Sequence, residues 1–132
     1  MIVLDASVMV EVLLNRPSAA RLASRLFHPD EALHAPHLID LEVTQALRRY
    51  QASGEMSPQR AHQAILAFVQ MPLERHPHWP FLNRIWELRR NLTAYDAAYV
   101  SLAEALDARL LTCDRALASA PGHRAKIELV EN

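Results

Sequence analysis

The chain has 132 residues, of which 51% are hydrophobic and 22% are charged, a composition typical of one soluble globular domain over residues 1–132. A single cysteine, Cys113, excludes an internal disulfide framework and a multi-cysteine zinc site, which favours a reducing compartment such as the cytoplasm. The formal net charge is −1, and no apolar run approaches the ~18 residues of a membrane helix. We therefore expect no membrane span.

Short apolar segments alternate with helical patterns along the chain. In chain order, we expect a strand at 2–4, helices at 7–14 and 18–27, a strand at 33–35, helices at 37–50 and 57–69, a strand at 73–76, helices at 81–90 and 96–106, a strand at 109–112, a short helix at 115–119 and a strand at 126–130. Strands separated by helices throughout predict an α/β layer fold with a parallel sheet.

Four acidic residues stand near the end of an expected strand or the start of an expected helix, among apolar neighbours: Asp5, Glu42, Asp96 and Asp114. A simpler role is open to three of them. Asp5 and Asp114 could each cap the helix that follows, and Thr93-x-x-Asp96 fits a capping box with aspartate in place of glutamate.

Glu42 is different, because its helix face carries Leu38, Ile39 and Ala46. A carboxylate in an apolar stripe needs a neutralising partner, which could be an arginine or a cation.

The four acids are expected to converge, because sites in parallel α/β sheets form beyond the carboxyl ends of the strands, where Asp5 and Asp114 would lie. Carboxylates gathered without counterions would repel one another, so a bound divalent cation is the best explanation for such a cluster. Ligands that are all oxygen select magnesium or manganese over zinc. Ser7 and Thr112, each two residues from an acid, are candidate hydroxyls that orient the ligands.

These segments together resemble a known family. Asp5-x-Ser7 after the first strand, Glu42 within Glu-Val-x-x-Ala-Leu-Arg-Arg, Asp96 within Leu-Thr-x-Tyr-Asp-Ala-Ala-Tyr, and Asp114 within Leu-Thr-x-Asp look like the PIN domain, and specifically the VapC toxin ribonucleases of bacterial toxin–antitoxin pairs. Each motif alone is weak, but the four in this order span almost the whole chain.

The resemblance implies a three-layer α/β/α sandwich with a central parallel sheet of four to five strands. It implies a Mg²⁺-dependent endoribonuclease, with Mn²⁺ as a substitute, in which a metal-activated water hydrolyses RNA phosphodiester bonds. The acidic site would comprise Asp5, Glu42, Asp96 and Asp114. The resemblance also implies a cytoplasmic homodimer that pairs with a small VapB-type antitoxin.

Two positions depart from the family pattern. Many relatives carry asparagine three residues after the second acid, where this chain has Gln45, and some carry a further acid shortly after the fourth, where it has Ala116 and Leu117. Gln45 still offers an amide oxygen. Together with Ser7, Thr112 and Thr93 it completes the expected supporting residues.

Arginine supplies thirteen of the fourteen basic residues, and its planar fork suits phosphate. Arg48 and Arg49 are the candidate RNA contacts, with a solvated helix end as the alternative interpretation.

Two other functions stay open. A catalytically idle PIN-like module that only binds RNA or protein would share the fold, although its signature, a missing acid, is not found here. A receiver-like phosphoacceptor domain would need paired acids after the first strand and a lysine near the last, whereas Asp5 stands alone and Lys126 opens the last strand.

The histidines and tryptophans favour structural roles. His34, His37, His76 and His78 could suggest zinc, but no helical His-x-x-x-His pair or second cysteine accompanies them, so surface histidines are the favoured interpretation. The two tryptophans, Trp79 and Trp86, are expected in core or dimer packing.

Overall fold

The computed structural model describes residues 1–131. Within this range, five strands form one all-parallel sheet in the order β3-β2-β1-β4-β5. The strands are β1 (Ile2–Leu4), β2 (Leu33–Pro36), β3 (Leu73–His76), β4 (Arg109–Thr112) and β5 (Lys126–Leu129). The expected parallel sheet of four to five strands is thus confirmed, with five strands.

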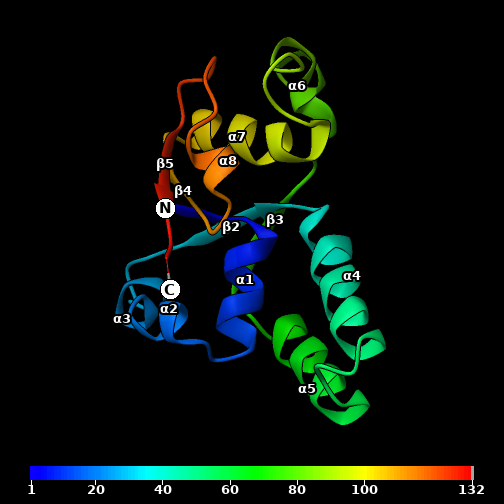
Figure 1. The fold of residues 1–132 in the computed structure, drawn as a ribbon. Coiled ribbons are helices and arrows are strands. Elements are labelled where there is room, and N and C mark those ends of the chain that lie inside the picture. The colour runs from blue at the N-terminus through cyan, green and yellow to red at the C-terminus, as the bar shows by residue number, and fades with distance from the viewer. Residues whose placement is uncertain (132) are drawn as a thin grey trace.

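Helices connect the strands and cover both faces of the sheet. They are α1 (Ala6–Leu13), α2 (Pro17–Ala20), α3 (Ala23–Leu26), α4 (Ile39–Ala52), α5 (Pro58–Val69), the 3₁₀ helix η1 (Trp79–Phe81), α6 (Leu82–Glu87), α7 (Ala94–Leu106) and α8 (Arg115–Ala118). In Figure 1, α6 and α7 lie above the sheet, and α1, α4 and α5 lie below it. The arrangement is the predicted three-layer α/β/α sandwich.

The central strands are buried on both faces, as parallel strands between two helical layers must be. Val3 and Leu4 in β1 and Leu110 and Leu111 in β4 are inaccessible to solvent. Helix α7 is buried along much of its length, since every residue from 97 to 103 is buried. Among residues 1–131, no helix is both long and apolar enough to span a membrane.

Two expected helices differ from the structure. The predicted helix 18–27 is two short helices, α2 and α3, because the Leu22 N–H bonds to the Ala19 carbonyl, three residues back, and the helical ladder is interrupted there. The predicted helix 81–90 ends at Glu87. Beyond it, the Arg89 N–H bonds to the Trp86 carbonyl, again three residues back, so the chain continues as tight turns.

Candidate active site

Asp5 lies at the carboxyl end of β1 and is the N-cap of α1, where its carboxylate accepts the Val8 N–H at 3.2 Å. Its side chain is almost fully buried, with 6% of the residue exposed. Two hydroxyls donate to it, from Ser7 to Oδ1 at 2.5 Å and from Thr112 to Oδ2 at 2.5 Å. Asp5 is therefore held in one orientation by three donors.

The same two hydroxyls connect β1 to the end of β4. Ser7 Oγ accepts the Cys113 N–H at 2.9 Å, and Thr112 Oγ1 accepts the Asp114 N–H at 3.0 Å. The hydroxyl of Thr112 thus bonds to the Asp5 carboxylate, whereas it reaches Asp114 only through the backbone. The structure places Ser7 and Thr112 as supports of Asp5.

Asp96 and Asp114 lie at the starts of α7 and α8. Asp114 is exposed and is the N-cap of α8, where it accepts the N–H groups of Ala116 and Leu117. Thr93 is the N-cap of α7 and accepts the Asp96 N–H at 3.1 Å. Asp5 and Asp114 thus cap their helices, and Thr93 caps α7. Among the hydrogen bonds of residues 1–131, the Asp96 N–H donates to Thr93, but the return bond of a capping box, from the Thr93 N–H to the Asp96 carboxylate, is not formed.

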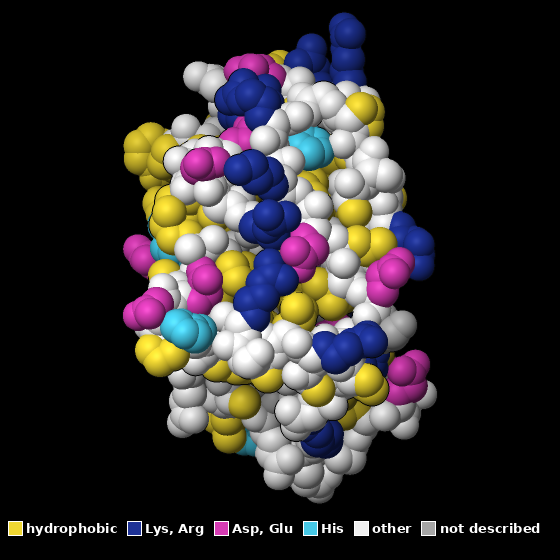
Figure 2. Space-filling model, turned by 90° about the vertical axis from the view of Figure 1, so that its left-hand side faces the viewer, with side chains coloured by type: hydrophobic (Ala, Val, Ile, Leu, Met, Phe, Trp, Pro, Cys, Tyr) yellow, Lys and Arg dark blue, Asp and Glu magenta, His cyan; other side chains and the backbone are white. Residues whose placement is uncertain are grey.

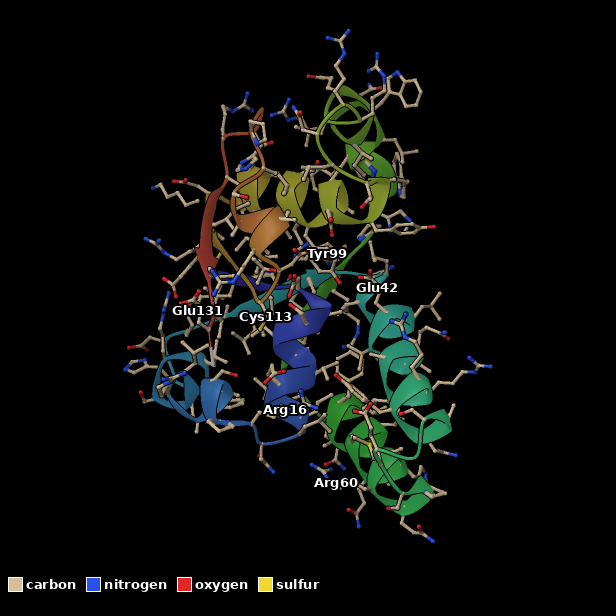
Figure 3. All side chains as sticks on the ribbon, viewed as in Figure 1. Arg16, Glu42, Arg60, Tyr99, Cys113 and Glu131 are labelled. Atoms are coloured by element: carbon tan, nitrogen blue, oxygen red, sulfur yellow. The ribbon has the colours of Figure 1, made fainter. Side chains whose placement is uncertain are left out.

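Glu42 lies in the first turn of α4 and is half-buried. Its Oε1 accepts the hydroxyl of Tyr99 from α7 at 2.6 Å, so the two residues face each other across the gap between α4 and α7 (Figure 3). Sequence reasoning did not assign Tyr99 to the site. Its spacing could have indicated the site, because Tyr99 lies three residues after Asp96 and hence on the same side of α7.

Burial and mutual repulsion raise the pKa values of three of these acids. Burial raises the pKa of Asp5, opposed by the Ser7 and Thr112 hydroxyls, and the charge of Asp96 raises it further. Burial likewise raises the pKa of Glu42, opposed by the Tyr99 hydroxyl, with Asp5 and Asp96 adding to the rise. The pKa of Asp96 is raised by burial and then by the charge of Asp114. The charge of Asp96 therefore acts on Asp5 and Glu42, and the charge of Asp114 acts on Asp96.

The four carboxylates offer the all-oxygen donors that hard divalent cations prefer. No three of them bring ligand atoms within 4.8 Å of one another in residues 1–131, so holding one ion would require these side chains to move closer together. Within residues 1–131, none of the four carboxylates forms an ion pair with a Lys, Arg or His side chain. Carboxylates whose pKa values are raised first by burial and then by neighbouring negative charge would be stabilised in their charged form by a nearby cation.

A groove of about 300 Å³ lies beside Glu42. It is lined by residues of α1 and α4, among them Glu42, Arg49 and Tyr50, together with Cys113. Arg48 lines a different hollow, between α4 and α5. The structure thus separates the two candidate arginines, since only Arg49 borders the groove that contains Glu42. Gln45, on the same helix, is exposed.

The β5 side of the molecule displays other basic side chains, with acidic ones among them (Figure 2). Several are paired. Arg25 of α3 binds Glu128 of β5 at 2.6 Å, and Arg115 binds Glu131 at 2.6 Å. These arginines already have acidic partners.

The aromatic residues and histidines differ in part from expectation. Trp79 and Trp86 are 71% and 67% exposed, so they are not core residues. His34 is buried, with only 5% exposed, which corrects the interpretation that it is a surface histidine.

The comparison with known families agrees with this geometry, since the family model of the PIN domain matches residues 2–122. The chain belongs to the PIN-domain family. Among curated relatives of this PIN domain, ribonuclease VapC12 of Mycobacterium tuberculosis is 43% identical over 130 residues, which cover 98% of this chain and 99% of the relative. Ribonuclease VapC1 of the same species is 43% identical over 129 residues, covering 97% and 96%. The PIN domain described here is thus a member of the VapC group.

Solved structures share the fold of this PIN domain. VapBC2 from Rickettsia felis, bound to a DNA fragment from the promoter, superposes with a TM-score of 0.71 at 16% identity, covering 99% of this chain and 100% of the matched chain. PAE2754 from Pyrobaculum aerophilum gives 0.69 at 23% identity, covering 96% and 81%.

Proposed function

We propose that this PIN domain is the magnesium-dependent endoribonuclease toxin of a VapBC-type toxin–antitoxin pair. The observation that carries the proposal is the placement of four carboxylates at the ends of strands and the starts of helices, none of them ion-paired with a Lys, Arg or His side chain within residues 1–131: Asp5, Glu42, Asp96 and Asp114. The relatives support the proposal, because VapC12 and VapC1 are both named ribonucleases.

Asp5, Glu42, Asp96 and Asp114 would hold the metal, and Mn²⁺ would be able to replace Mg²⁺. The bound ion would activate water for attack on the phosphodiester and offset the negative charge that develops on the scissile phosphate. The chain's own residues fix the geometry. Ser7 and Thr112 hold both oxygens of Asp5, and Tyr99 holds Oε1 of Glu42. Fixed ligands need no reorganisation as the reaction proceeds.

RNA would lie along the groove beside α4. Among the described residues that line this groove, Arg49 is the one basic side chain. Its guanidinium can donate two hydrogen bonds to a phosphate of the substrate. We assign Gln45 and Thr93, which are both exposed, to the rim of the site.

A cleavage assay on labelled cellular RNA tests the proposal. We expect Asp96→Asn to lower cleavage by more than about 100-fold, because removal of a metal ligand should exceed the 10–100-fold effect of removing a supporting contact. Asp30→Asn is the matched control, since Asp30 is exposed and distant in sequence from all four acids. Wild-type turnover by Asp96→Asn, or full activity in excess chelator, would contradict the mechanism.

The same assay separates the endoribonuclease from the catalytically idle module. A folded wild-type protein that binds RNA but leaves it intact in Mg²⁺ and in Mn²⁺ would favour the binding module.

We also propose a VapB-type antitoxin as partner and a homodimer as the assembly, in the cytoplasm. Support for the antitoxin comes from structural neighbours that are toxin–antitoxin complexes, from Rickettsia felis and Klebsiella pneumoniae. Support for the dimer comes from the exposed apolar side chains around α6, which are Trp79, Leu82 and Trp86. Light scattering should give twice the 14.9 kDa chain mass, and a monomer would exclude the dimer.

A further inference from the structure

A second group of metal-ligating side chains lies on strands β2 and β3, away from the four acids. His34 in β2 is paired in register with Glu74 in β3, and His76 follows two residues after Glu74. Residues opposite each other in neighbouring strands share a face of the sheet, as do residues two apart in one strand. The three side chains therefore point to one face.

That face is the side of the sheet on which α7 packs against β2 (Figure 1). Between Glu74 and His76, Arg75 points the other way, since its guanidinium lies over the Phe68 ring of α5 and bonds Asp40 of α4. Successive side chains in a strand alternate between faces. Glu74 and His76 thus lie opposite α4 and α5.

The ligand atoms of the three residues converge. His34 Nδ1 lies 2.8 Å from His76 Nε2 and 3.5 Å from Glu74 Oε2. All three ligand atoms lie within 4.8 Å of one another, and this is the one such group of three His, Cys, Asp or Glu residues among residues 1–131. The two imidazole nitrogens face each other and can share one proton.

Within residues 1–131, the polar contacts of the His34 side chain are with His76 and Glu74. Its side chain is buried, and its other ring nitrogen, Nε2, has no hydrogen-bond partner among the described residues. A buried imidazole is usually satisfied by neighbouring polar groups. Among the described residues, the buried His34 ring is therefore satisfied only through Nδ1, by its contacts with His76 and Glu74.

We propose that His34, Glu74 and His76 form a second metal site, which binds a first-row transition-metal dication such as Zn²⁺. Two imidazoles and one carboxylate are donors that suit zinc, whereas magnesium prefers oxygen alone. The site shares no residue with the acidic group and does not rest on the proposed nuclease function.

The geometry needs a small adjustment to receive the ion. Zinc–nitrogen bonds of about 2.0–2.1 Å at a tetrahedral angle place two nitrogens about 3.3 Å apart. The His34 and His76 nitrogens would separate by roughly half an ångström, and the partly exposed His76 can make that movement. Glu74 is 66% exposed at its side chain, so water can reach the fourth ligand position.

A metal here would hold β3, the edge strand, to β2. Without the metal, His34 and His76 share one hydrogen bond between rings whose centroids lie 5.1 Å apart. Because the ion binds the folded arrangement of two strands, its binding free energy adds to stability. The readout is therefore stability as well as affinity.

The test measures Zn²⁺ binding by calorimetry and the thermal midpoint, with excess Mg²⁺ present to occupy oxygen-only sites. We expect wild-type protein to bind one Zn²⁺ and to melt at a higher temperature with it. His76→Ala should weaken zinc affinity at least about tenfold and remove the rise in melting temperature, and Glu74→Gln should weaken affinity in the same direction. Circular dichroism checks that both variants fold.

Two controls separate this site from adventitious binding. His78→Ala alters an exposed histidine two residues away and should bind zinc as the wild type does. Asp96→Asn alters the acidic group and should also bind zinc normally. Absence of zinc binding by the wild type, equal affinity in His76→Ala and the wild type, or loss of binding in Asp96→Asn with retention in His76→Ala would each overturn the proposal.

Discussion

At the scale of single residues, Asp5 shows how a helix cap can also be a site residue. Its Oδ1 accepts the Val8 N–H of α1 and the Ser7 hydroxyl, while Oδ2 accepts the Thr112 hydroxyl. A carboxyl group has about four lone-pair positions, so three donors leave room for a further ligand. Capping and ligand roles are therefore compatible at this position.

Tyr99→Phe tests whether the Glu42 contact matters for metal binding. The hydroxyl donates to Glu42 and holds the pKa of that carboxyl below the value that burial would otherwise give it. Without it, Glu42 should be protonated more readily, and the Mg²⁺ concentration for half-maximal cleavage should rise by about tenfold or more.

Tyr95→Phe is the matched control, because Tyr95 lies one turn earlier on α7 and is 65% exposed. We expect wild-type magnesium dependence for that variant. If Tyr99→Phe also keeps the wild-type dependence, Tyr99 has no positioning role.

At the scale of elements, α4 presents different chemistry on neighbouring faces. Its first turn carries Glu42, and Arg49 lies two turns later beside the same groove. Arg48 is rotated by about 100° around the helix and faces the hollow against α5. The adjacent arginines therefore form a natural test pair.

In the inactive Asp96→Asn background, Arg49→Ala should weaken RNA binding by about three- to tenfold and lower the salt slope by about one. Arg48→Ala should leave both nearly unchanged. Fluorescence anisotropy across a salt series measures both quantities, and equal effects of the two substitutions would show that the groove does not guide RNA.

At the scale of the whole molecule, one ion pair joins the upper helices to the loop before β5. Arg84 of α6 donates to both oxygens of Glu104 on α7, at 2.8 and 2.9 Å, and the Arg124 N–H donates to Oε2 at 2.7 Å. The Glu104 side chain is only 6% exposed. Loss of this carboxylate should therefore loosen three segments at once.

Glu104→Gln should lower the free energy of unfolding by about 1–3 kcal/mol at pH 7. The Arg84 guanidinium and the Arg124 N–H hold the pKa of Glu104 below its usual value. A carboxyl group whose pKa is lower in the folded state than in the unfolded state stabilises the fold at pH values above its unfolded-state pKa of ~4.3. This stabilisation is lost as the pH falls through the pKa of the folded state.

The difference between wild type and Glu104→Gln should therefore shrink as pH falls below about 4. Urea unfolding across pH measures it. Glu87→Gln is the control, because Glu87 contacts the same arginine at 3.2 Å but is exposed, and it should change stability by less than about 1 kcal/mol. A constant difference at all pH values would show that the charge of Glu104 contributes nothing.

The sequence by itself determined the alternation of strands and helices and the parallel sheet, and it singled out the four acids as candidate ligands. These rest on local signals, because side-chain periodicity, turn residues and motifs are readable within a few residues of one another. Local signals weaken where a helix is short, which is why the α2–α3 break was not predicted.

Only the tertiary structure decided which distant side chains meet. The Tyr99–Glu42 bond joins residues of α7 and α4, and the placement of Arg49 on the acidic side depends on how α4 is rotated against its neighbours. The convergence of His34 with Glu74 and His76 depends on the register of β2 and β3. Register and helix rotation follow from packing of the whole core, and no short stretch of sequence encodes them.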